Sequence, residues 1–266
     1  MTWRVVSASV TGTGHVRDGD QCQDAFRVVH GEAPSGRPYV IVVVSDGAGS
    51  AKLGGRGAAL AVEASCDALR ERIAVHEPAS LDDQVIREVA VAVRARLSRE
   101  AIAESLDVRD LACTLLGAVV ADDFAAFFQV GDGAIITTGE PTYAVVFWPD
   151  AGPFANMTYF ITDDDALEHL RICLRQQAPD EFALFSDGMQ RLALVFEGQR
   201  VHSPFFLPMF ERLRCARADQ CEELCEHLER FLDSPQVNQR TDDDKTLVLA
   251  TRLPPDTTGN HDAACV

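Results

Sequence analysis

The stretch VIVVVSDG, residues 40–47, is a run of Val and Ile that ends in Ser45, Asp46 and Gly47. The same arrangement returns as FALFSDG at residues 182–188, and a variant, FFQVGDG, occupies residues 127–133. A short apolar run rich in β-branched and aromatic residues predicts a buried strand, and Asp-Gly directly after it predicts a turn. The sequence therefore predicts three buried strands, each of which delivers an Asp to the end of a sheet.

The sequence on both sides of residues 40–47 predicts further strands and two long helices. The opening strands are expected at residues 3–11, 25–30 and 39–44. Apolar residues at helical spacing predict helices at 54–73 and 81–106, with Ser80 as a candidate N-cap of the second. A block of four strands follows at 112–120, 124–130, 134–138 and 143–148. Turns at 122–123 and 139–141 make the strands that they join antiparallel.

The last third of the chain is less regular. We expect a short helix within 166–177, a strand at 181–185, helices at 208–217 and 219–232, and a final strand at 246–251. Strands and helices do not alternate strictly, which favours an α+β architecture of antiparallel sheets flanked by helices in layers. No repeat or linker divides the chain, so residues 1–253 are expected to form one domain and residues 254–266 a disordered tail.

Composition excludes several classes of partner. The 266 residues contain 24 Lys and Arg against 41 Asp and Glu, a formal net charge of −17. Such a charge repels phosphate backbones and anionic lipids, so nucleic acid and membrane surfaces are not expected partners. No apolar run is long enough to span a bilayer, and no signal peptide precedes the first strand, so we expect a cytoplasmic protein with reduced cysteines.

Acidic residues at the ends of strands indicate a metal site. Asp46 and Asp187 end two strands, Asp24 begins another, and Asp243 lies just before the last one. If these four carboxylates converge, their charges require cations, and an all-oxygen ligand set favours Mg²⁺ or Mn²⁺ over zinc. Two such ions with a bridging water would suit attack on a phosphoryl group.

An ordered set of short motifs carries a family resemblance. In chain order the motifs are G-T-G-H at 12–15, C-Q-D at 22–24, S-D-G-A-G-S-A-K at 45–52, C-T-L-L at 113–116, G-D-G at 131–133, P-F-A-N-M-T-Y-F at 153–160, S-D-G-M at 186–189 and D-D-K-T-L at 243–247. With this set the chain resembles the metal-dependent protein phosphatase 2C family, and especially a compact bacterial branch of it. The resemblance implies a four-layer sandwich of two packed antiparallel sheets flanked by helices.

The resemblance also implies an activity and roles for particular residues. The activity is hydrolysis of phosphoserine and phosphothreonine in proteins by direct attack of a water that bridges two Mn²⁺ or Mg²⁺ ions. Asp46 would bridge the ions, and the Gly47 carbonyl would bind one of them. Asp187 and Asp243 would bind the other, and Asp24 would lie in the first or second shell. Asp132 corresponds to a residue that helps to hold a weaker third ion in bacterial relatives.

The chain departs from the family pattern at three places. Gln23 stands where many relatives have Glu, which removes one charge from the cluster. Ala48 stands where animal relatives have a His that is often proposed as general acid. The family's phosphate-contacting Arg has no counterpart at the usual spacing, so His15 first and Arg17 second are candidates for the phosphate anchor.

The sequence lacks the motifs of several other enzyme classes. Residues 47–52 lack the third Gly of a dinucleotide-binding loop. A P-loop is excluded because residues 49–54 are followed by Gly55 and Arg56 rather than by Lys and Ser or Thr, and the chain has no G-x-S-x-G nucleophile motif. The alternative from a different class is a catalytically weak relative that binds phosphoproteins or acts as a scaffold. We expect a monomer whose partners are proteins phosphorylated on Ser or Thr, including the substrates of a partner kinase.

Overall fold

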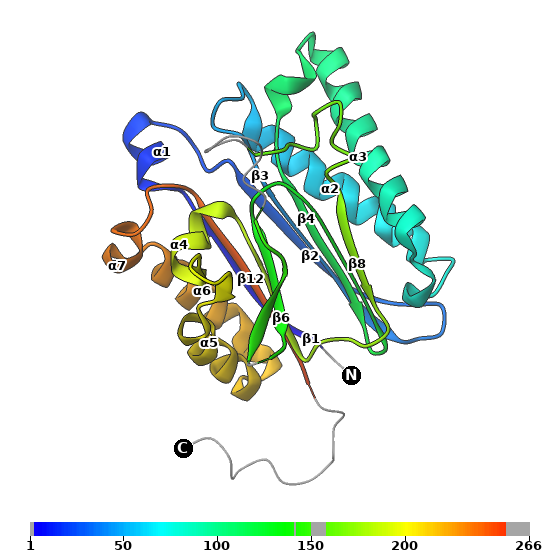
Figure 1. Ribbon diagram of the computed structural model, residues 1–266, viewed down its shortest axis with the longest axis vertical. Coiled ribbons are helices and arrows are strands. Elements are labelled where there is room, and N and C mark those ends of the chain that lie inside the picture. The colour runs from blue at the N-terminus through cyan, green and yellow to red at the C-terminus, as the bar shows by residue number, and fades with distance from the viewer. Residues whose placement is uncertain (1–2, 141, 150–157, 254–266) are drawn as a thin grey trace.

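Two five-stranded antiparallel sheets, packed face to face, form the centre of the computed structural model (Figure 1). The structure describes residues 3–140, 142–149 and 158–253. A pair of helices covers the outer face of each sheet, which produces the four-layer α+β sandwich that the sequence predicts (Figure 1). The boundary predicted at residue 253 for a disordered tail falls where the described residues end, so the tail lies outside them.

Each sheet combines strands from distant parts of the chain. One sheet has the order β2 (Asp24–Glu32), β3 (Pro38–Asp46), β4 (Leu115–Ala121), β5 (Phe124–Val130) and β8 (Arg171–Arg175), and is covered by α2 (Gly54–Ile73) and α3 (Asp83–Glu104). The other has the order β1 (Trp3–Val10), β12 (Lys245–Arg252), β9 (Glu181–Phe185), β6 (Ala134–Thr138) and β7 (Tyr143–Phe147), and is covered by α5 (Ser203–Cys215) and α6 (Cys221–Leu232). Shorter elements are α1 (Thr13–Asp18), α4 (Gln190–Ala193), β10 (Leu194–Val195), β11 (Arg200–Val201) and α7 (Pro235–Asn238).

The continuous apolar run in β3 follows from burial on both faces of its sheet. Val40, Val42 and Val44 point between the two sheets, whereas Ile41 and Val43 pack against α2 and α3. All five side chains are fully buried. A strand covered on only one face would alternate apolar with polar residues, so the unbroken run reflects a layer on each side.

Three local predictions differ from the structure. The segment predicted as a short helix within 166–177 contains β8, because its backbone pairs with the otherwise open edge of β5. Asp82 rather than Ser80 caps α3, since its side chain accepts a hydrogen bond from Val85 N (2.9 Å). The loop expected after the first strand instead contains the short helix α1.

The link between β5 and β6 carries the chain from one sheet to the other. β4 with β5, and β6 with β7, are antiparallel neighbours within a sheet, as predicted. β5 and β6, in contrast, belong to different sheets, so the Gly-Asp-Gly turn at 131–133 crosses between them. Asp132 therefore lies where the ends of the two sheets meet.

Two further expectations concern the redox state of the cysteines and membrane-spanning segments. Cys22, Cys66, Cys113, Cys173, Cys221 and Cys225 are free thiols, as expected. Cys215, in contrast, is disulfide-bonded, so the expectation that the cysteines are reduced is wrong for this residue. Within the described ranges, no helix combines the length and the apolar character needed to cross a membrane.

Candidate active site

The pairing of β2 with β3 brings two of the predicted carboxylates together. Asp24 is the first residue of β2 and Asp46 the last of β3, and the two are direct partners in the antiparallel register. Opposed residues of this kind have neighbouring side chains. Asp187 follows β9 and Asp243 precedes β12 in the other sheet. Asp46 and Asp187 share a hydrogen bond, so the cluster joins the two sheets.

An open cavity of about 1000 Å³ lies over these strand ends. We call it the carboxylate cavity, because Asp46, Asp132, Asp187 and Asp243 line it together with Gly47 and His15. Asp24 lies behind this surface: its Oδ2 accepts a hydrogen bond from Ser186 Oγ (2.7 Å), and its buried Oδ1 has no hydrogen-bond partner.

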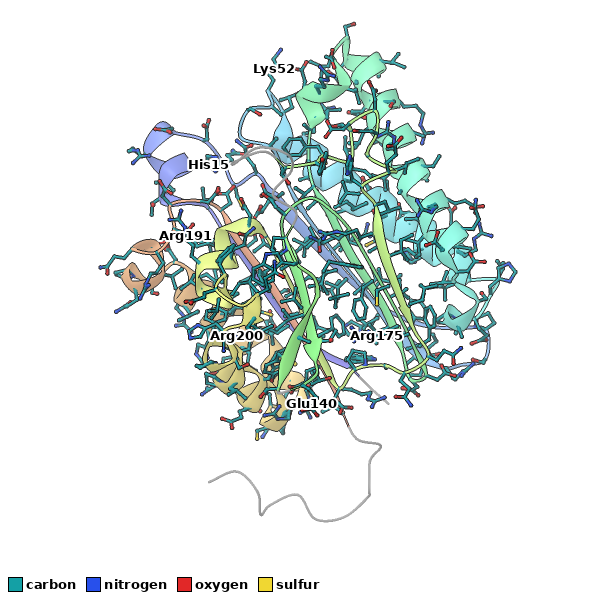
Figure 2. The ribbon with its side chains drawn as sticks, viewed as in Figure 1. His15, Lys52, Glu140, Arg175, Arg191 and Arg200 are labelled. Atoms are coloured by element: carbon teal, nitrogen blue, oxygen red, sulfur yellow. The ribbon has the colours of Figure 1, made fainter. Side chains whose placement is uncertain are left out.

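The remaining anchor candidate, Arg17, does not line the carboxylate cavity. Its side chain is 70% exposed and lies 3.6 Å from Asp18. His15 lines the cavity from the same helix, α1, so of the two candidates the one ranked first from the sequence faces the carboxylates (Figure 2).

Burial and mutual repulsion raise the pKa values of the central carboxyl groups. Burial, followed by the charge of Asp24, raises the pKa of Asp46 well above its ordinary value. Burial is also the main reason that the pKa of Asp24 and of Asp187 rises to about 7. Without a cation, the cluster therefore retains protons at a pH where isolated carboxyl groups are ionised.

Close backbone contacts explain the glycine that follows Asp187. A Cβ atom on Gly188 would lie 2.0 Å from the carbonyl oxygen of Asp244. Similarly, a Cβ atom on Gly12 would lie 2.3 Å from the carbonyl carbon of Asp243. Only glycine permits these approaches, so the Ser-Asp-Gly turn and the loop before β12 can meet at the cluster.

Asp244 organises the loop that carries His15, a role that sequence reasoning missed. Its buried carboxylate accepts hydrogen bonds from Gly12 N (2.6 Å) and Gln23 N (2.5 Å), and Oδ1 lies 2.9 Å from His15 Nδ1. Burial alone would lower the pKa of His15, but its interactions with Asp244, together with the charges of Asp243 and Asp20, outweigh burial and raise it. One indication of this role was present in the sequence, because Asp244 directly precedes a buried strand.

Ser186 is a second residue that the sequence analysis did not single out. Besides donating to Asp24, its hydroxyl accepts a hydrogen bond from Thr246 N (3.1 Å). It thereby ties β9, β12 and the start of β2 into one unit. The signal was the repeated Ser in both Ser-Asp-Gly motifs, although Ser45 makes a different bond, to the carbonyl oxygen of Thr114 (2.5 Å).

The structure also shows the contacts of the residues that depart from the family pattern. The backbone of Gln23 is well bonded, since its carbonyl accepts from Gly47 N (3.1 Å), but its side-chain Oε1 is buried without a hydrogen-bond partner. Ala48 is buried at the cavity wall. The P-F-A-N-M-T-Y-F match lies mostly outside the described residues.

The donor set fits hard divalent cations. All its side-chain ligand atoms are oxygens, and Asp24 Oδ1 is a buried acceptor that lacks a donor. Among the described residues, no three His, Cys, Asp or Glu side chains already surround a common point. Asp46 and Asp187 instead share a hydrogen bond. Cation binding would therefore compete with the protons that these carboxyl groups retain.

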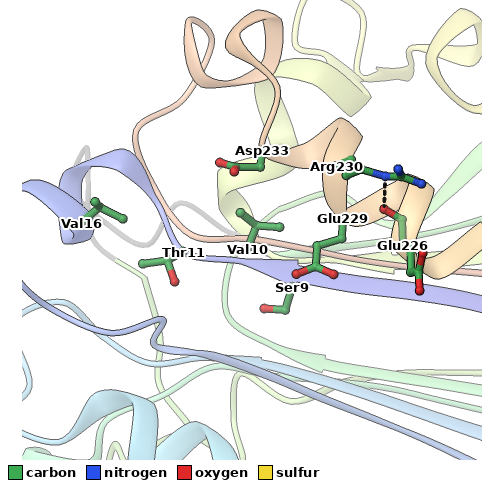
Figure 3. A pocket seen from close by; sticks show the side chains of 8 residues that line it. All are labelled: Ser9, Val10, Thr11, Val16, Glu226, Glu229, Arg230 and Asp233. Carbon is green, nitrogen blue, oxygen red and sulfur yellow. Dashed lines mark hydrogen bonds between the residues drawn. The ribbon is translucent and has the colours of Figure 1, made fainter.

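A second cavity, between β1 and α6, differs in character (Figure 3). Its volume is about 560 Å³. Its acidic side chains are exposed at the surface, and Arg230 turns back to bond the carbonyl oxygen of Glu226 (3.3 Å). The lining residues are Ser9, Val10, Thr11, Val16, Glu226, Glu229, Arg230 and Asp233. It lacks the buried, mutually perturbed carboxyl groups of the carboxylate cavity.

Comparison with known proteins identifies the family. The family model described as Protein phosphatase 2C matches residues 11–233. The chain belongs to the protein phosphatase 2C family. Serine/threonine-protein phosphatase 3 of Escherichia coli (strain K12) is 41% identical over 250 residues, which cover 94% of this chain and 98% of that protein.

Solved structures agree with the fold of this phosphatase 2C chain. A bacterial serine phosphatase superposes with a TM-score of 0.65 at 14% identity, covering 96% of this chain and 100% of the other. The catalytic domain of the serine/threonine phosphatase PstP, solved with two manganese ions, has a TM-score of 0.61 at 16% identity and covers 95% of this chain and 99% of the other. At these identities the likeness concerns the fold.

Proposed function

We propose that this phosphatase 2C chain hydrolyses phosphoserine and phosphothreonine in proteins, using two Mn²⁺ or Mg²⁺ ions. One observation carries the proposal: Asp46 and Asp187, from different sheets, meet at the floor of an open cavity within a cluster of carboxyl groups with raised pKa values. The family membership and the 41% identical phosphatase support the same activity.

The proposed ligands follow from the placement of the carboxylates. Asp46 would contact both ions, the Gly47 carbonyl would bind one, and Asp187 and Asp243 would bind the other. Asp24 would support this set from behind the cavity surface, and Asp132 would hold a weaker third ion. When bound, the ions would neutralise the cluster, orient the phosphate and supply an acidified bridging water for direct attack on phosphorus.

His15 is the proposed phosphate anchor. It lines the carboxylate cavity, and the contact of its Nδ1 with Asp244 fixes the orientation of the ring. A cationic imidazole would orient a phosphate oxygen and offset the surrounding negative charge. Arg17 is the second candidate, and its exposed side chain would have to leave Asp18 to reach the cavity.

Metal-dependent release of phosphate from a phosphothreonine peptide tests the function. We expect turnover with Mn²⁺ or Mg²⁺ and loss of turnover in excess EDTA. Calorimetry should show that Mn²⁺ binding releases protons, because the carboxyl groups with raised pKa values must ionise. Undiminished turnover in EDTA would overturn the mechanism, and binding of phosphopeptide without turnover would favour the scaffold alternative.

The substrate class follows from the shape of the site. A cavity open to solvent does not demand the longer reach of phosphotyrosine, so phosphothreonine and phosphoserine peptides should be preferred. Highly acidic peptides should be disfavoured by the net charge of −17. Faster turnover of phosphotyrosine would contradict this preference. The monomeric state, the cytoplasmic location and the link to a partner kinase stay predictions.

A further inference from the structure

Two aromatic residues, the exposed Phe196 and the half-buried Trp148, form part of the wall of the carboxylate cavity. Phe196 is 53% exposed, and its ring lies edge-on to Trp148 with 5.5 Å between ring centroids. Both residues line the same cavity as Asp46 and Asp187. We call this pair the aromatic rim. Single exposed aromatic residues are common, but an aromatic pair beside a cluster of carboxylates offers apolar surface where a substrate must approach.

The aromatic rim is held in place by the fold. Phe196 follows β10, whose residue Leu194 is buried in the core and pairs with Val201 of β11. The end of this hairpin is tied back to α4, because His202 N donates to the carbonyl oxygen of Ala193 (2.8 Å). These contacts fix the backbone of the β10–β11 hairpin, which exposes Phe196 to solvent.

Arg191 lies on α4, between Asp187 and Phe196 in sequence, and also lines the cavity (Figure 2). Its side chain is exposed, and within the described part of the chain it makes no ion pair and no side-chain hydrogen bond. The guanidinium is available to an incoming anion.

We propose that Arg191 and the aromatic rim form a substrate subsite for the polypeptide around the phosphorylated residue. The aromatic rim takes an apolar side chain of the substrate, and Arg191 takes an anionic group of the same substrate. This subsite rests on the proposed function, because it places the phosphorylated residue at the carboxylate cluster. Covering Phe196 removes apolar surface from water, and Arg forms strong hydrogen bonds with phosphate and carboxylate oxygens.

The test compares a phosphothreonine peptide that has a flanking Leu with N-acetyl-phosphothreonine amide. The parent protein and the variants Phe196→Ala and Arg191→Ala are assayed with Mn²⁺. Matched controls are Phe231→Ala, an exposed Phe on α6, and Arg200→Ala on β11, neither of which lines the cavity. Burial of one side chain predicts that Phe196→Ala lowers the peptide-to-amide ratio of kcat/KM about tenfold. An unchanged ratio, or an equal fall in Phe231→Ala, overturns the aromatic part.

The Arg191→Ala variant identifies the anion. An equal loss of about tenfold on both substrates assigns Arg191 to the phosphate, since both carry it. A loss confined to peptides with a flanking Asp or Glu assigns Arg191 to a substrate carboxylate. Activity equal to that of Arg200→Ala on every substrate overturns the role of Arg191.

A binding measurement separates this proposal from the proposed function. Fluorescence anisotropy of a labelled peptide with a phosphonate analogue of phosphothreonine reports affinity without turnover. Weaker binding by Phe196→Ala than by Phe231→Ala supports the subsite even if the parent protein releases no phosphate, in which case the proposed function alone fails. Equal binding by the parent, Phe196→Ala and Arg191→Ala overturns the subsite even if the parent is active.

Discussion

Without bound cations, this phosphatase 2C chain should have a larger free energy of unfolding in mild acid than in mild alkali. Folding raises the pKa of Asp24 from 3.8 to about 7, mainly through burial. The folded state therefore binds the proton more tightly than the unfolded state does. The stability that this proton provides is fully present below the unfolded pKa and is lost as the pH rises through about 7.

The size of the effect follows from the two pKa values. Between about pH 5 and about pH 8, the free energy of unfolding should fall by about 3 kcal/mol through Asp24 alone. Asp187, whose pKa also rises to about 7, shifts stability in the same direction. His15 does too, because its pKa is raised, so a variant is needed to isolate the carboxyl group.

Urea unfolding in EDTA at about pH 5 and about pH 8 measures this effect, with Asp24→Asn as the matched control. The amide keeps an acceptor for Ser186 Oγ but cannot ionise. The variant should show a smaller fall in stability between the two pH values than the parent does. Saturating Mn²⁺ should stabilise the parent most at the higher pH, where the carboxylates are ionised. Equal pH dependence in parent and variant would refute the reasoning.

Three other predictions concern activity and packing. Asp46→Asn should lower kcat at least about tenfold more than Asp132→Asn, because the first residue would contact both main ions and the second only the weaker one; steady-state assays in Mn²⁺ decide the order. His15→Ala should raise KM or lower kcat while Mn²⁺ affinity by calorimetry is retained, and unchanged kinetics together with a large loss in Arg17→Ala would make Arg17 the anchor. Phe182→Ala should lower the free energy of unfolding by about 3–5 kcal/mol, since its ring is fully buried between the sheets; a loss below about 1 kcal/mol in urea unfolding would contradict this packing.

The strands that carry the carboxylates were predictable because their signals are local. The runs before Asp46 and Asp187 are buried on both faces, so burial left a continuous apolar pattern in each. The helices at 54–73 and 81–106 were predictable for the same reason, because apolar spacing records which face of a helix meets a sheet.

Segments whose structure depends on a distant partner were not predictable. β8 was expected to be helical, and it is a strand because the edge of β5 offers unpaired backbone groups. The spacing of apolar residues in a segment does not indicate whether a distant strand edge will pair with it. In the same way, the His15 loop becomes α1 where Asp244 holds Gly12 and His15 from the far end of the chain.

The sequence by itself determined the ligand chemistry: several Asp residues at strand ends, in a chain of net charge −17, require cations wherever they converge. Only the tertiary structure decided which groups share the cavity. Packing of two sheets places Asp46 beside Asp187, buries Asp24 behind them, and turns Arg191 and Phe196 toward the same opening. The physical reason is that side-chain type depends on the residue alone, whereas proximity and burial depend on how separate sheets and loops pack together.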